Sequence, residues 1–188
     1  MRFASGIVIA AMFLAFGANV ASADSETVDY PSSDSTVVAS YPVINGSEFG
    51  YFWSGTRGDR ITETFTGTGL DSVYALDLDF DVTQNVLNSN AYVDWNVFVN
   101  GTAVGGFIWS EADGTGPAHF SYSFAPIVGN GTYTISMEVA NDVPSGYGSI
   151  AIGYPGTATL TGTVPEPASL AMLGIGIVGV CLRRRRKA

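Results

Sequence analysis

The sequence predicts an all-β protein, an antiparallel β-sandwich of jelly-roll type that is flanked by an N-terminal signal peptide and a C-terminal hydrophobic helix. Three observations support this prediction. Apolar and polar residues alternate along most of the chain, turn residues separate the alternating stretches, and no segment between the two ends sustains a helical period. About ten short strands divided in this way favour a sandwich over parallel βαβ units.

The first 23 residues are predicted to be a secretory signal peptide. Arg2 precedes an apolar core from Ile7 to Phe16, and small residues follow, ending in Ala-Ser-Ala at positions 21–23. The apolar core is shorter than the roughly 20 residues that span a bilayer, which favours a cleaved signal over an uncleaved membrane anchor. We therefore expect export of a mature chain that begins at Asp24.

Residues 24–36 are rich in Ser and Asp and show no apolar period, which predicts a flexible mature N-terminus. The β-sandwich domain is expected over residues 37–163. Its clearest strands carry apolar residues on one parity, and these expected inward positions are Tyr74, Leu76, Leu78, Phe80 and Val82; Ala91, Val93, Trp95, Val97 and Val99; Phe120, Tyr122 and Phe124; and Tyr133, Ile135, Met137 and Val139. Shorter strands are expected at residues 36–44, 48–53, 60–66, 103–109, 148–152 and 157–163.

Three Asn-Gly pairs predict tight turns between these strands. Asn100-Gly101 is the most specific of them, because it lies between two apolar runs and a type I′ turn needs two positive φ angles that Asn and Gly tolerate. Asn45-Gly46 and Asn130-Gly131 are expected to be turns for the same reason.

The charged residues are distributed unevenly. The chain has 17 acidic and 8 basic residues and a net charge of -9, but six of the basic residues lie in the two terminal segments. Between Asp24 and Val164 only Arg57 and Arg60 oppose sixteen acids, which gives this body a net charge of -14. A lysine-free body this acidic lacks the basic patches that bind nucleic acid or anionic membranes, so we expect neither as a partner.

The C-terminal segment, residues 164–188, predicts a membrane-associated signal. Pro165-Glu166-Pro167 precedes fifteen uncharged residues, Ala168 to Leu182, and a basic cluster follows, consisting of Arg183, Arg184, Arg185, Arg186 and Lys187. A helix of fifteen residues extends about 22 Å, less than the roughly 30 Å hydrocarbon core, so spanning needs snorkelling arginines or local thinning. The basic cluster should stay on the cytoplasmic side, which leaves the body outside the inner membrane.

This arrangement resembles the PEP-CTERM sorting signal of Gram-negative bacteria. The resemblance begins at Val164 and rests on the order of the tripeptide, an apolar segment with Gly174, Gly176 and Gly179, and the basic end. It implies a transiently anchored precursor whose partners are the secretion translocase and an exosortase, a membrane transpeptidase that processes the chain near the tripeptide. It further implies a final place at the cell surface or in the exopolysaccharide matrix of a biofilm. An ordinary tail anchor is the alternative.

Asp77, Asp79 and Asp81 form an acidic ladder on the expected outer face of one strand. Alternate residues of a strand lie about 6.8 Å apart, so their carboxylates repel only weakly in water and a hard cation could bridge them. Calcium needs six to eight oxygen ligands, which one strand face cannot supply alone. A calcium site and a solvated acidic face therefore both stay open as interpretations, and no other cofactor is expected.

Trp53 and Trp109 are the candidates for stacking on a sugar ring. Each lies at the end of an expected strand, directly before a serine, where exposure is more plausible than at a strand centre. Packing in or at the rim of the core is the alternative for both. Trp95 shares its parity with four apolar residues, so we expect it in the core.

The sequence gives little support for catalysis, and we expect no enzyme. His119 is the only histidine, and it shares the polar side of its strand with Ser121 and Ser123, as a surface residue would. No serine elbow, HExxH motif or nucleophilic cysteine occurs. The hypotheses are, in order, a noncatalytic exported surface or matrix protein, a carbohydrate-binding module with or without calcium, and a carboxylate-dependent glycoside hydrolase.

Overall fold

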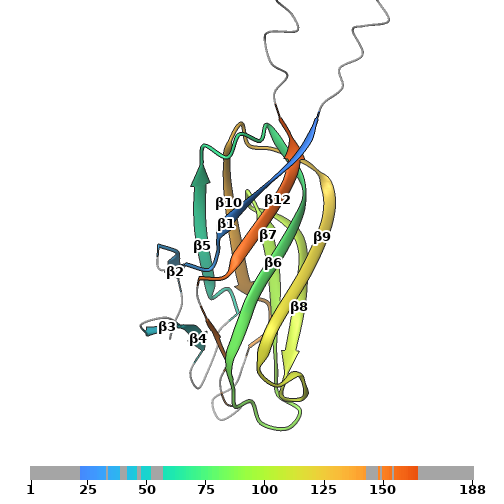
Figure 1. Ribbon diagram of the computed structural model, residues 1–188. Coiled ribbons are helices and arrows are strands. Elements are labelled where there is room, and N and C mark those ends of the chain that lie inside the picture. The colour runs from blue at the N-terminus through green and yellow to red at the C-terminus, as the bar shows by residue number, and fades with distance from the viewer. Residues whose placement is uncertain are drawn as a thin grey trace, which may run out of the picture. The chain divides into compact units, whose positions relative to one another are not determined.

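The computed structural model describes residues 22–32, 34–38, 42–45, 48–51, 57–142, 148, 150–153 and 155–164. In the unit from Ala23 to Thr163 the described secondary structure consists of strands and one short 3-10 helix; Figure 1 shows the strands. Its elements are β1 (Ala23–Asp29), β2 (Thr36–Val38), β3 (Pro42–Asn45), β4 (Glu48–Tyr51), β5 (Arg60–Thr66), β6 (Ser72–Asn85), β7 (Tyr92–Val99), β8 (Thr102–Ser110), the short 3-10 helix η1 (Glu111–Asp113), β9 (Gly116–Val128), β10 (Thr132–Val139), β11 (Ile150–Gly153) and β12 (Thr157–Thr163).

The described strands form two antiparallel sheets. In the larger sheet the long strand β6 pairs with β9 on one side and with β12 and then β11 on the other. β1 pairs with β12, and β4 and β3 continue the sheet beyond β11. The smaller sheet runs β2-β5-β10-β7-β8. Without the short strands β2, β3, β4 and β11, the orders β1-β12-β6-β9 and β5-β10-β7-β8 are those of an eight-stranded jelly roll. The predicted fold is therefore confirmed.

Aromatic rings join the two sheets in the interior. Phe107 on β8 stacks against Phe120 on β9, with ring centroids 4.3 Å apart, and against Trp95 on β7 at 5.9 Å. Phe80 on β6 contacts both phenylalanines of this stack. On β9 the predicted inward parity is confirmed, because Phe120, Tyr122 and Phe124 are partly buried while Ser121 and Ser123 between them are exposed. Burial raises the pKa of the Tyr122 phenol to about 12.

One predicted core position on β6 is wrong. Leu76, Leu78, Phe80 and Val82 are buried as expected, but Tyr74 is only partly buried, and the adjacent Val73 is fully buried in its place. The cause is an irregularity between Val73 and Ala75 in the pairing of β6 with β9, which shifts the inward parity by one residue.

The prediction of a flexible segment at residues 24–36 is also wrong. Residues 23–29 form β1, which pairs with β12 over its whole length. The segment lacks an apolar period because β1 is an edge strand held mainly by backbone hydrogen bonds, with most of its side chains outside the core. Tyr30, which follows it, is fully buried and donates its hydroxyl to the carbonyl oxygen of Ile61 at 3.1 Å.

The predicted turns agree with the structure where it describes them. Asn100 and Gly101 connect β7 to β8 with φ angles of 48° and 74°, and Asn130 and Gly131 precede β10 with φ angles of 50° and 82°. Asn45 ends β3, and Gly46 lies outside the described residues.

Within the residues described above, no helix is long and apolar enough to cross a membrane. The predicted signal peptide up to Ala21 and the apolar segment from Ala168 to Leu182 lie outside those residues.

Gly162 on β12 lies directly against the backbone of β6, and it provides a test of this packing. A Cβ at this position would lie 2.0 Å from the backbone oxygen of Ser72. Gly162→Ala must therefore push the strands apart, and we expect it to lower the free energy of unfolding by about 1–3 kcal/mol, as overpacking does. Chemical denaturation of the purified protein measures this loss.

Thr159→Ala is the control for this substitution, because Thr159 lies on the outer face of the same strand and its hydroxyl contacts that of Thr27. We expect its effect to stay below about 1 kcal/mol. A Gly162→Ala protein as stable as the parent would show that β12 is not seated this tightly.

Candidate functional site

The structure describes only part of the predicted site residues. Trp53, the tripeptide Pro165-Glu166-Pro167 and the basic cluster from Arg183 to Lys187 lie outside the described residues. The acidic ladder and Trp109 are described. The structure also contains a pocket that the sequence analysis did not predict.

The acidic ladder lies on the outer face of the larger sheet, where β6 pairs with β9. Asp79 is paired with His119, and its Oδ1 lies 2.7 Å from the ring Nδ1. Asp77 is paired with Ser121 and accepts a hydrogen bond from the Ser121 hydroxyl. That hydroxyl oxygen also lies 3.0 Å from His119 Nε2. Asp81 continues the ladder along β6 and is exposed.

The chain Asp79-His119-Ser121 has the connectivity of a catalytic triad, but its chemistry differs. The Ser121 proton is donated to Asp77, so it is not shared with the imidazole as a nucleophile's proton would be. The side chains of His119 and Asp79 are 59% and 51% exposed, so water reaches both. These contacts describe a hydrogen-bonded polar surface.

The contacts of the ladder carboxylates bear on the interpretation of the ladder as a calcium site. Across the part of the chain that the structure describes, no three His, Cys, Asp or Glu side chains come together as a metal site requires. Asp77 and Asp79 are already engaged by Ser121 and His119. Of the two interpretations of the ladder, these contacts favour the solvated acidic face.

Trp109 is packed inside the sandwich. Only 9% of the residue is exposed, its ring meets Phe120 edge to face at a centroid distance of 6.5 Å, and its Nε1–H donates to the carbonyl oxygen of Gly114 at 3.1 Å. The hypothesis that Trp109 stacks on a sugar does not fit this position, because the indole faces the core. The alternative, packing at the rim of the core, does.

The turn after β8 holds the Trp109 acceptor in place. Both the backbone N–H and the hydroxyl of Ser110 donate to Asp113 Oδ2 at 2.7 Å, and these bonds hold the pKa of the Asp113 carboxyl below its usual value. The ionised form therefore stabilises the turn above the unfolded pKa, and this contribution is lost as the pH falls through the folded pKa. Asn85 Nδ2 donates to the Gly114 carbonyl at 3.0 Å and ties the same turn to β6.

The pocket lies where the chain crosses from one sheet to the other, between β1 and β2. At this crossing the Tyr30 N–H donates to the Gly156 carbonyl at 2.9 Å, and the Gly156 N–H donates to the Pro31 carbonyl at 2.8 Å. These two bonds hold the crossing segment against the start of β12. Strand β5 of the smaller sheet lies on the other side of the crossing.

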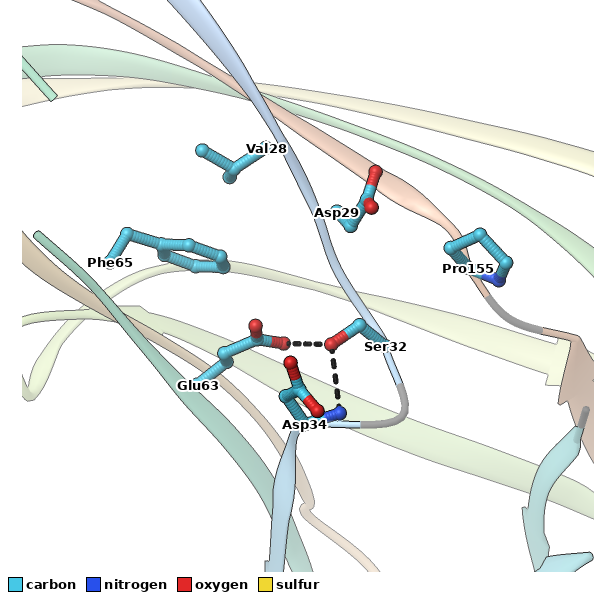
Figure 2. A pocket seen from close by; sticks show the side chains of 7 residues that line it. All are labelled: Val28, Asp29, Ser32, Asp34, Glu63, Phe65 and Pro155. Carbon is cyan, nitrogen blue, oxygen red and sulfur yellow. Dashed lines mark hydrogen bonds between the residues drawn. The ribbon is translucent and has the colours of Figure 1, made fainter.

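Seven residues from these elements enclose a volume of about 490 Å³ (Figure 2). The lining residues are Val28, Asp29, Ser32, Asp34, Glu63, Phe65 and Pro155. The volume is within the range of about 300–1,000 Å³ that is usual for small-ligand sites. The pocket is therefore large enough for a sugar residue.

Glu63 is the most firmly held carboxylate of the pocket. Its Oε2 accepts hydrogen bonds from the hydroxyls of Ser32 at 2.8 Å and Ser35 at 2.6 Å. The Ser32 hydroxyl oxygen accepts in turn from the Asp34 N–H at 3.1 Å, and the Ser35 hydroxyl oxygen accepts from the Ser32 N–H at 3.0 Å. This network wraps the crossing segment around the Glu63 side chain.

The pocket combines carboxylates with an apolar wall. Asp29 and Asp34 are exposed and Glu63 is partly buried, so all three can accept hydrogen bonds from hydroxyl or amine groups of a ligand. The ring of Phe65 meets Tyr30 edge to face, at a centroid distance of 6.4 Å, and supplies aromatic surface for the C–H groups of a ligand.

The sequence does not predict this pocket, because the lining residues are far apart in the chain. Asp29, Ser32 and Asp34 lie in the segment that was expected to be flexible, and Pro155 comes from the other end of the body. One signal was present in β5. Glu63 lies between Ile61 and Phe65 on the inward parity of the strand, where an apolar residue would be expected.

Comparison with known proteins confirms the C-terminal motif. The family model of the PEP-CTERM protein-sorting motif matches residues 163–186, which is the segment that carries the predicted resemblance. A search of curated proteins returned no significant match.

Several solved structures are similar to this chain at low identity. The CBM36-1 domain of a multidomain xylanase from the hindgut metagenome of Trinervitermes trinervoides is 17% identical with a TM-score of 0.46, covering 73% of this chain and 96% of that one. A family 35 carbohydrate binding module from Clostridium thermocellum is 14% identical with a TM-score of 0.48, covering 71% and 97%. The C-terminal CBM6 of LamC from Zobellia galactanivorans is 12% identical with a TM-score of 0.43, covering 73% and 99%. Similarities of this size carry no functional conclusion.

The burial of Trp109 predicts a loss of stability when the side chain is removed. We expect Trp109→Ala to lower the free energy of unfolding by about 3–5 kcal/mol, because it leaves a cavity next to Phe120. Thermal or urea denaturation measures this, with Tyr92→Ala as the control because Tyr92 is 45% exposed. An unchanged stability for Trp109→Ala would mean that the indole lies at the surface.

Proposed function

We propose that this chain is a noncatalytic exported protein that acts at the cell surface or in the exopolysaccharide matrix of a Gram-negative bacterium. The observation that carries the proposal is the PEP-CTERM sorting motif at residues 163–186. In this proposal an exosortase-type transpeptidase processes the chain near Pro165-Glu166-Pro167, so the protein is the substrate of that reaction.

The limits of the β-sandwich support this proposal. The sandwich extends from Ala23 to Thr163, so the expected signal-peptide cleavage before Asp24 and the sorting tripeptide lie at its two borders. Processing at both borders would release the folded body almost intact. The secretion translocase would act on the first border, and the inner membrane would hold the precursor until the second is processed.

The composition of the body supports a role outside the cytoplasm. It has a net charge of -14, no lysine and no cysteine. Such a surface keeps the protein soluble and discourages contact with nucleic acid or anionic lipids. It therefore suits a protein that persists in a hydrated polysaccharide layer.

Carbohydrate binding is the second candidate function, and the pocket of Figure 2 favours it. A pyranose ring has apolar C–H faces and polar hydroxyl edges. The ring of Phe65 would pack against the former, and the carboxylates of Asp29, Asp34 and Glu63 would accept hydrogen bonds from the latter.

The first prediction concerns processing of the two ends. The intact mass of the protein recovered from the cell surface should correspond to a chain that begins at Asp24 and lacks the residues after the tripeptide. Replacing Pro165, Glu166 and Pro167 with alanines should leave a chain that begins at Asp24 but retains its C-terminal segment in the membrane fraction, because the extended recognition segment is lost.

Glu111→Ala serves as the processing control, because it removes an exposed carboxylate from the body and leaves the tripeptide intact. Its mass and location should match those of the parent protein. A surface protein that retains Arg183 to Lys187 would identify the segment as a plain tail anchor.

The second prediction concerns the pocket. If a glycan array identifies a ligand, Phe65→Ala should weaken its binding by about fivefold or more, because the aromatic wall is removed. Phe98→Ala is the matched control, since Phe98 lies on β7 under Arg60 and does not line the pocket. Full retention of binding by Phe65→Ala would remove the pocket from the proposal, and release of reducing ends would indicate a glycoside hydrolase instead.

A further inference from the structure

Among the residues that the structure describes, no basic side chain forms an ion pair with the carboxylates of the pocket. The body contains no lysine and only two arginines. Arg60 is committed to Glu138 through a salt bridge and lies over the ring of Phe98. In the described part of the chain no ion pair reaches Asp29, Asp34 or Glu63.

Three uncompensated carboxylates around one concavity favour a cationic occupant. A cleft lined by a single sign of charge concentrates the field and raises the local concentration of ligands of the opposite sign. Both serine hydroxyls donate to Glu63 Oε2, which leaves Oε1 as an acceptor for a ligand. A neutral sugar would leave these charges unbalanced, whereas a protonated amine would balance them.

The apolar side of the pocket favours an organic cation over a metal ion. Val28, Phe65 and Pro155 are three of the seven residues that line the pocket, and none of them offers a side-chain ligand to a hard cation. The face of a phenyl ring attracts an ammonium group, and the apolar wall accommodates the carbon skeleton that carries it. The pocket therefore matches a ligand with an ammonium group on a compact ring.

We propose that the pocket binds the protonated amine of a hexosamine unit in a de-N-acetylated polysaccharide. This inference rests on carbohydrate binding as proposed above, and it specifies the class of sugar. The ammonium group would lie among the carboxylates of Asp29, Asp34 and Glu63, and one face of the sugar ring would pack on Phe65.

Calorimetric titration of the full-length protein tests this directly. The probes are three tetrasaccharides of the same linkage, namely β-1,4-linked glucosamine, its fully N-acetylated form and cellotetraose. We expect the glucosamine tetramer to bind at least about tenfold more tightly than the other two, and to lose affinity as the salt concentration rises, since exposed charges are screened.

Variants separate the charge from the fold. Glu63→Gln keeps an oxygen that can accept from both serine hydroxyls, so the crossing segment should stay folded while one charge is lost. We expect Glu63→Gln and Asp29→Asn each to weaken binding of the glucosamine tetramer about fivefold. Phe65→Leu should weaken it about threefold, because the aromatic surface under the sugar ring is lost but the apolar volume is retained.

Glu111→Gln is the charge-matched control, because it removes one negative charge in η1, after β8, at the opposite edge of the smaller sheet from β5. Its affinity should equal that of the parent protein. Melting curves of every variant should overlay that of the parent, so that weaker binding cannot be attributed to unfolding.

The remaining outcomes overturn the inference in distinguishable ways. Equal binding of all three tetrasaccharides leaves carbohydrate binding in place and removes the preference for an amine. Binding of none removes both. Spermidine or a lysine peptide that binds as tightly as the glucosamine tetramer identifies a nonsugar cation, and calcium that binds with heat abolished by Glu63→Gln identifies a metal site.

Discussion

The last strand of the sandwich lies between its first strand and one from the middle of the chain. β12 pairs with β1 along one side and with β6 along the other. Since β6 also carries β9 and β11, the larger sheet cannot close until residues 157–163 are available. Pairings this distant in sequence make folding slow, because loop-closure entropy is lost before the contacts form.

The pocket depends on the same closure. Asp29 pairs with Thr157 at the end of the β1–β12 ladder. The next residue, Tyr30, donates its backbone N–H to the Gly156 carbonyl, and the Gly156 N–H donates to the carbonyl of Pro31. Without β12 in place, the crossing segment would lose these backbone bonds and would be held beside Glu63 from the β5 side alone. The pocket thus forms only in the closed sandwich. In a partly folded chain its lining residues would lie apart.

Local signals made most of the fold predictable. The alternation of Ala91 to Val99 and the Asn100-Gly101 turn depend on near neighbours in sequence, and both agree with the structure. The bulge beside Tyr74 and the strand β1 could not be predicted from near neighbours, because pairing partners far along the chain determine them. The pocket could not be predicted for the same reason, because its residues come together only in the folded chain. The one local signal was Glu63, a charged residue at an inward position of β5.

The adjacency of the two ends of the body has a mechanical consequence. Ala23 pairs with Thr163, so the chain enters and leaves the sandwich at one point. A pull on the segment after Val164 acts along the axis of β12, perpendicular to the hydrogen bonds of the ladders on both sides. Such a load is shared in shear by all these bonds together, whereas peeling an edge strand would break them one by one. A body tethered through this strand would resist detachment by flow.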